Sequence, residues 1–187
     1  MDTVIAVGIG IGLASVAGVR ASLPLALAAL FSVFGVFSFP PIVAVGEWAY
    51  VGAFVGLAVV EVALDKLPAV ESAFNIVMAP LRAAAGALLF GAAVGSSAVT
   101  LLVVGALIAG VVASLKVVLR PAAREASSGV STTFLSLIED AVGLVGGVIA
   151  LFVPFLPVLL VAFLLFFYAR IRKRRGRKFG GLRILGD

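Results

Sequence analysis

Seven apolar runs, separated by short stretches that carry charge, Pro or Gly, fill most of this chain. They cover residues 3–19, 22–38, 49–66, 82–98, 100–119, 134–152 and 155–171. Since a helix needs about 20 apolar residues to cross a bilayer, most of these runs are barely long enough. The pattern predicts an all-α, polytopic transmembrane helix bundle of about seven helical segments, in which the shortest runs are candidates for half-helices or re-entrant pieces.

The composition agrees with a membrane protein and narrows its chemistry. Of 187 residues, 63% are hydrophobic and 12% charged, far from the balance of a soluble domain. The chain has neither Cys nor His, which removes disulfides, the usual zinc ligands and the usual base at neutral pH. We therefore expect no metal site, no cofactor and no enzymatic activity. The length predicts one transmembrane domain, residues 1–171, and a basic cytoplasmic tail, residues 172–187.

The basic residues predict the orientation. If every run crosses once, one side receives Arg20, Lys66, Arg82, Lys116, Arg120, Arg124 and the basic residues from Arg170 to Lys178. The connections on the other side, within 40–47, 95–97 and 152–155, contain no Lys or Arg. This asymmetry predicts a multi-pass protein of the cell membrane with its N-terminus outside and its C-terminus in the cytoplasm. We expect the tail to contact anionic lipid head groups and not nucleic acid.

Two of the runs end in charge followed by proline. The third ends with Glu61, Asp65 and Lys66 before Pro68, and the fifth ends with Lys116 and Arg120 before Pro121. Proline stops a helix, so these are read as matched helix ends. Each is followed by about a dozen residues, 69–80 and 122–133, that we expect to lie at the interface or to dip back into the protein. The similarity suggests two parallel repeats, 49–98 and 100–152.

The spacing of these charges predicts an encounter between two helices. Glu61 and Asp65 are four residues apart and share a helix face, and so do Lys116 and Arg120. We expect the acidic face to meet the basic one, because unpaired charge in lipid costs several kcal/mol. Two interpretations stay open. The charges are either interhelical salt bridges near the cytoplasmic boundary, or the lining of a polar, partly hydrated vestibule.

Three further charges interrupt apolar sequence. Glu139 and Asp140 are adjacent and point about 100° apart on a helix. We favour a helix-capping role for Asp140, and a site role for Glu139 as a proton acceptor or cation ligand. Arg20 is either a cytoplasmic turn or part of a discontinuous helix whose guanidinium faces a cavity.

Four motifs resemble, in order, the multi-pass membrane family known as domain of unknown function 4126. They are GVRASLPLAL, EVALDKLPAVES, APLRAAAGALL and SLIEDAVGLV, spread over residues 12 to about 160. Where the family often has Asp after D-K-x-P, this chain has Glu71, and where it often has Pro after the Arg, this chain has Ala83. The resemblance brings no established chemistry. It implies that the charged residues within these four elements are motif positions.

These observations favour a small transporter or channel for an ion or small polar solute, with a charged cavity facing the cytoplasm. The alternative is a membrane scaffold or lipid-binding protein whose buried charges only join helices. A homodimer is a further expectation, because so small a bundle makes a thin pathway alone. The candidate binding residues are Arg20, Glu61, Asp65, Lys66, Arg82, Lys116, Arg120, Glu139 and Asp140.

Overall fold

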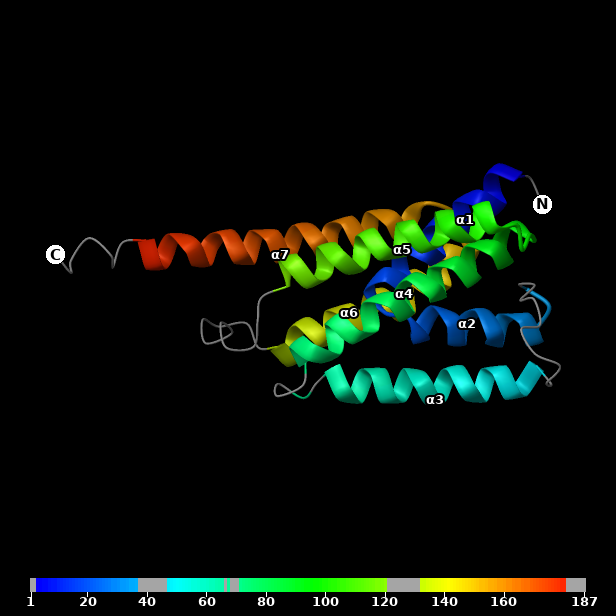
Figure 1. Ribbon diagram of the computed structural model, residues 1–187, viewed down its shortest axis with the longest axis horizontal. Helices are drawn as coiled ribbons and strands as arrows, with labels where there is room; N and C mark the ends of the chain where they lie inside the picture. The colour runs from blue at the N-terminus through cyan, green and yellow to red at the C-terminus, as the bar shows by residue number, and fades with distance from the viewer. Residues whose placement is uncertain (1–2, 37–46, 66, 68–70, 121–131, 181–187) are drawn as a thin grey trace.

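The computed structural model describes residues 3–36, 47–65, 67, 71–120 and 132–180, which contain helices and no strand. The helices are α1 (Thr3–Val19), α2 (Ser22–Val33), α3 (Glu47–Asp65), α4 (Glu71–Val94), α5 (Val99–Leu119), α6 (Thr132–Phe152) and α7 (Leu156–Gly180). All of them run roughly along the long axis of the molecule (Figure 1). The predicted all-α bundle is confirmed.

The helices differ in their ability to cross a bilayer. By length and composition α3, α4, α5 and α6 qualify as spans, whereas α1 and α2 are shorter apolar helices. With 12 residues, α2 is about 18 Å long, little more than half of a hydrocarbon core of about 30 Å. The prediction that the shortest runs include half-helices therefore applies to α2.

The first two helices form a hairpin inside the bundle. α1 packs against α4, α5, α6 and α7, and all of its residues from Gly12 to Val19 are buried. The chain turns at Arg20 and Ala21 and returns as α2, so the tip of the hairpin lies among the other helices. α3 packs mainly on α2 and lies on the outside (Figure 1). The hairpin is thus the core around which the longer helices gather.

α2 ends at Val33, five residues before the end of the predicted run, because a glycine stops it. Gly35 has φ +70°, which favours glycine, and its N–H donates to the Ser32 carbonyl. The N–H of Val36 donates to the Phe31 carbonyl, which completes a Schellman motif. Gly95 ends α4 in the same way, with φ +69°.

Residues 69–80 differ from their prediction as an interfacial or re-entrant piece. From Glu71 onward they are the first turns of α4, which continues through Pro80 to Val94. Arg82 spans the proline by donating to the backbone carbonyl and the side-chain oxygen of Asn75, at 3.5 and 3.1 Å. Pro80 leaves the Ile76 carbonyl, four residues earlier, without its helical donor, so these bonds join the two sides of the proline and do not replace the missing one.

The segment 122–133 and the end of the last apolar run can also be compared with the structure. Of the segment 122–133, only the start of α6 lies within the described residues. α7 runs to Gly180, so the helix continues beyond the predicted span end at residue 171 into the basic tail. Whether 49–98 and 100–152 superpose as repeats stays a prediction.

Candidate functional site: a buried ion-pair network

Arg20, at the tip of the α1–α2 hairpin, is fully buried and joins two other helices. Its Nη2 lies 2.8 Å from Asp65 Oδ2 at the end of α3 and 2.8 Å from Asp140 Oδ1 on α6. The same nitrogen donates to Ser136 Oγ at 2.9 Å and lies 3.7 Å from Glu139. Arg20 therefore lies in a buried turn between two helices and not in an exposed turn, whereas the predicted cavity facing its guanidinium stays a prediction.

Glu61 caps the start of α2. Its carboxylate accepts hydrogen bonds from the backbone N–H of Ser22 at 3.0 Å and of Ala21 at 3.4 Å, and from the Ser22 hydroxyl. A helix N-terminus favours such an anion, because its first N–H groups have no partner within the helix. Arg82 of α4 lies 3.5 Å from the same carboxylate. Glu61 therefore ties α3 and α4 to the hairpin.

Asp65 is shared between two arginines. Arg120, just after α5, approaches it with two nitrogens, at 2.9 and 3.3 Å, in the bidentate arrangement that suits guanidinium and carboxylate. Asn75 of α4 donates to Asp65 Oδ1 at 3.3 Å. The contact between Asp65 and Arg120 is the α3–α5 encounter that the spacing predicts.

Glu139 forms the centre of a second group. It lies 2.8 Å from Lys116 Nζ and 3.2 Å from Arg120, and it accepts a hydrogen bond of 2.5 Å from the Tyr168 hydroxyl of α7. Lys116 also donates to the carbonyl of Val19 at the end of α1, at 2.9 Å. Lys116 thus pairs with α6 and the hairpin, whereas the sequence analysis paired it with α3.

The described part of the network is balanced in charge. Its cations are Arg20, Arg82, Lys116 and Arg120, and its carboxylates are Glu61, Asp65, Glu139 and Asp140. All side chains except those of Arg120 and Asp140 are completely excluded from solvent, and these two are 5% and 18% exposed. Removing one partner of a buried pair typically costs about 3–5 kcal/mol, since the other charge stays buried alone. The network is therefore strongly interdependent.

The network lies at one level of the bundle. Along α3, Glu61 is about 21 Å from the helix start, and Glu139 is about 20 Å from the end of α6 at the same end of the molecule (Figure 1). In a core of about 30 Å, this level is roughly two-thirds of the way across, nearer the end where α3 and α5 finish.

Eight of the nine residues singled out from sequence meet in this network. Asp140, expected to cap its helix, contacts Arg20 instead. Lys66, the ninth, lies outside the described residues. Sequence reasoning overlooked Asn75 and Tyr168. Asn75 precedes Arg82 by seven residues, two helical turns, so a helix continued through Pro80 would have placed them on one face.

The residue types limit what the network can do. Among the residues that the structure describes, no group of three carboxylates, Cys or His is placed to hold a metal ion. A side chain of this network can bind a new partner only when an existing ion pair opens. A carboxylate could then take up a proton or a cation, and a guanidinium could take up an anion.

Comparison with known proteins finds one family. The family model described as Domain of unknown function (DUF4126) matches residues 7–174, nearly the whole chain, and includes every residue of the network. No curated protein and no solved structure matches the chain.

Proposed function

Since the chain belongs to the DUF4126 family, whose description names no activity, we propose a function from the geometry: a small integral-membrane transporter or channel for an ion or small polar solute. One observation carries this proposal. The α1–α2 hairpin brings Arg20 into the interior, among carboxylates of α3 and α6. Broken helices that end beside charge within the membrane are typical of transport sites.

The number of charges supports the same conclusion. Joining helices requires few buried ion pairs, and replacing such pairs by apolar residues is often neutral or stabilising. Eight charged side chains at one level exceed that need. Ionisable residues inside a membrane protein are expected to mark ion or proton pathways, with their partners close by.

The proposed mechanism is exchange of partners. Glu61, Asp65 and Glu139 take up a proton or cation as their pairs open. Arg20, Lys116 and Arg120 balance that charge or hold an anionic solute. α3 is the element whose movement would open these pairs, because it packs mainly on α2 and carries two of the carboxylates.

The proposal places the protein in the cell membrane, with its N-terminus outside and its C-terminus in the cytoplasm. The network then lies nearer the cytoplasmic surface, and the end of α7 meets anionic head groups there. We also propose that the protein forms a homodimer and has no enzymatic activity.

Ion flux into liposomes tests the proposal. Wild type is compared with Glu61→Gln, and with Glu47→Gln as a matched control, because Glu47 begins the same helix about 21 Å away. We expect flux of at least one ion in wild type and in the control, and a loss in Glu61→Gln with its folding retained. Absence of flux for every ion in well-folded wild type would contradict the proposal.

A second candidate is a non-transporting scaffold. The network contains four cations and four carboxylates, which are almost wholly excluded from solvent. Such a balanced and dry network needs no ligand, which favours the scaffold. Hydrogen exchange separates the two candidates. In a transporter the network opens repeatedly, so the amides near Glu61 exchange faster than those elsewhere on α3, whereas in a scaffold they are protected at least as well as the rest of that outer helix.

A further inference from the structure

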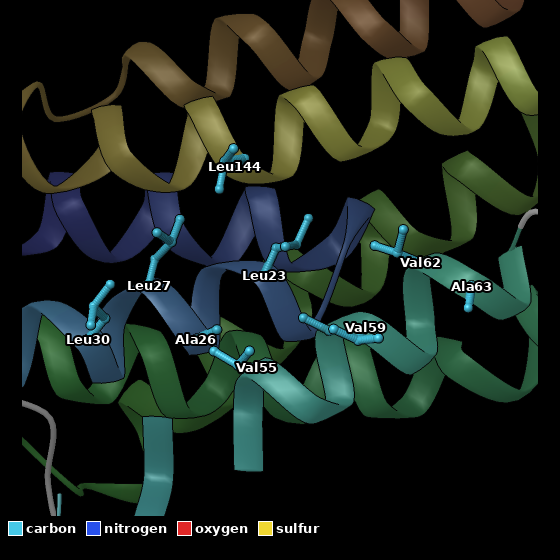
Figure 2. Close-up of a pocket in the computed structure, with 10 residues that line it drawn as sticks. Leu23, Ala26, Leu27, Leu30, Val55, Val59, Val62, Ala63 and Leu144 are labelled. Carbon is cyan, nitrogen blue, oxygen red and sulfur yellow. The ribbon is translucent and has the colours of Figure 1, made fainter. Parts of the chain in front are cut away.

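An apolar groove runs along the outside of the bundle, with α2 as its floor and α3 and α6 as its walls. Its volume is about 540 Å³. Figure 2 shows Leu23, Leu27 and Leu30 along α2, with Val55 and Val59 of α3 on one side and Leu144 of α6 on the other. The lining consists only of Leu, Val and Ala. The groove therefore suits a hydrocarbon chain.

One end of the groove points toward the ion-pair network. On α3, Val62 and Val55 precede Asp65 by three and ten residues and share its helix face. On α6, Leu144 follows Asp140 by four residues. Leu23 follows Arg20 by three residues.

Gly143 confirms that the groove and Arg20 adjoin. A Cβ added to Gly143 would lie 2.9 Å from Leu23 Cδ1 and 3.2 Å from Arg20 Cβ, so both side chains border this glycine. The apolar stripes of all three helices thus lead to the trio of Arg20, Asp65 and Asp140.

Beyond this end of the groove, behind its apolar lining, lie charged groups of both signs. Arg20 Nε and Nη1 are buried and have no hydrogen-bond acceptor among the described residues. Asp140, beside them, has the most exposed side chain of the network's carboxylates, at 18%. Guanidinium N–H groups suit phosphate oxygens, and a carboxylate suits an ammonium group.

We propose that the groove and the trio at its end form a binding site for a phospholipid whose head group joins a phosphate to a primary ammonium. One hydrocarbon chain occupies the groove. The phosphate accepts hydrogen bonds from Arg20, and the ammonium donates to Asp140.

The direction of the groove agrees with this occupant. From Leu23 to Leu30 it extends about 10 Å away from the network, toward the middle of the bilayer. A lipid of the leaflet nearest the network has the same direction, head at the charged level and chain inward. The network level, roughly two-thirds across the core, lies about 10 Å inside that leaflet's hydrocarbon boundary, so the bound head group sinks by about that depth to reach the trio.

Other lipids fit less well. An anionic head group without a cation would place its phosphate near Asp140 and supply no ammonium to pair with that carboxylate. A quaternary ammonium has no N–H to donate to a carboxylate. The proposed site does not depend on transport, and it applies equally to a scaffold.

Lipid titration followed by native mass spectrometry tests the site on the full chain. The probes are phosphatidylethanolamine, phosphatidylcholine and phosphatidylglycerol with identical chains. We expect the ethanolamine lipid to bind about tenfold more tightly than the choline lipid, the effect of one charge-assisted hydrogen bond. In Asp140→Asn, with folding checked by thermal unfolding, this preference should disappear.

A pair of neighbouring valines tests the groove itself. Val59 lines it, and Val60 is similarly exposed, at 52% against 64%, but does not. Val59→Trp should weaken binding of both zwitterionic lipids, whereas Val60→Trp should not.

Three results of the lipid titrations would overturn the proposal. They are equal affinity for the ethanolamine and choline lipids, tightest binding of the glycerol lipid, and equal effects of the two Trp substitutions. Soluble phosphoethanolamine binding as tightly as the lipid would also overturn it, because the groove would then contribute nothing. None of these results bears on ion flux.

Discussion

At the scale of the residue, Glu139 depends on side chains from outside its own helix. It contacts Lys116 of α5, Arg120 after α5 and the Tyr168 hydroxyl of α7. A fully buried carboxylate is tolerable only when its oxygens are satisfied, so each of these contacts stabilises a charge that would otherwise oppose folding. The phenol is the most easily tested, because one oxygen atom can be removed while the ring stays in place.

Tyr168→Phe should lower the free energy of unfolding by about 1.5–3 kcal/mol, the range for a hydrogen bond to a charged group. Equilibrium unfolding in mixed micelles measures the change. Repeating the substitution in Glu139→Gln provides the control, since the amide is a weaker acceptor and the loss should shrink. Equal losses in both backgrounds would mean that the phenol stabilises the protein by packing and not through Glu139.

At the scale of the element, the close crossing of α4 and α5 fixes the position of Arg82 relative to Lys116. Gly86 and Gly105 face each other there, and a Cβ added to Gly86 would lie 2.7 Å from the Gly105 carbonyl oxygen. Small residues allow such approach between membrane helices. Because the obstruction is backbone, no side-chain rotation can relieve it.

Gly86→Ala should therefore destabilise the protein by about 1–3 kcal/mol, although alanine is the better helix former. Gly110→Ala, on the same helix pair, is the matched control, because its Cβ would meet only Ala83 Cβ at an ordinary 3.9 Å. Thermal unfolding measures the loss of stability in each variant. A loss at Gly110 as large as that at Gly86 would show that the crossing is not as close as described.

The elements also show where prediction from sequence stops. Apolar runs and prolines revealed the helices, and the buried charges were visible because charge is rare in such runs. The ends of α2 and α4 shifted because Gly35 and Gly95 stop helices by φ, which hydropathy does not register. Pro80 was taken as a break, yet Arg82 and Asn75 bridge it within α4.

The partners in the network were harder to predict than its members. The spacing of Asp65 and Arg120 implied their contact, because both lie at helix ends of the same level. The contact between Lys116 and Glu139 requires α6 to be placed beside α5 and the hairpin, and no local pattern encodes that placement. Tyr168 is one aromatic residue in an apolar run, with nothing to mark its hydroxyl as buried against a carboxylate.

At the scale of the whole molecule, two properties concern the bilayer: the depth at which the hairpin tip lies, and the orientation that the basic residues indicate. The α4–α5 connection and the later turns of α7 lie at opposite ends of the molecule (Figure 1). In the proposed orientation, which follows the positive-inside rule, the α7 end faces the cytoplasm. Arg20 does not contribute to this assignment, because it is buried in the network and not in a cytoplasmic turn. The same holds for Arg82, Lys116 and Arg120, which are also part of the network, so the assignment depends on the basic residues of α7.

Labelling of single cysteines tests both the depth of the hairpin tip and the orientation. Because the sequence contains no Cys, only the introduced residue can react. Ser97 and Lys173 are exposed near opposite ends, and Ala21 is 2% exposed at the hairpin tip. With a maleimide that cannot cross membranes, Ser97→Cys should react in intact cells, Lys173→Cys only after permeabilisation, and Ala21→Cys in neither state. If Lys173→Cys reacted in intact cells and Ser97→Cys only after permeabilisation, the orientation would be the opposite one. Ready labelling of Ala21→Cys after permeabilisation would return the hairpin tip to the cytoplasmic surface, and with it Arg20, on whose burial the network depends.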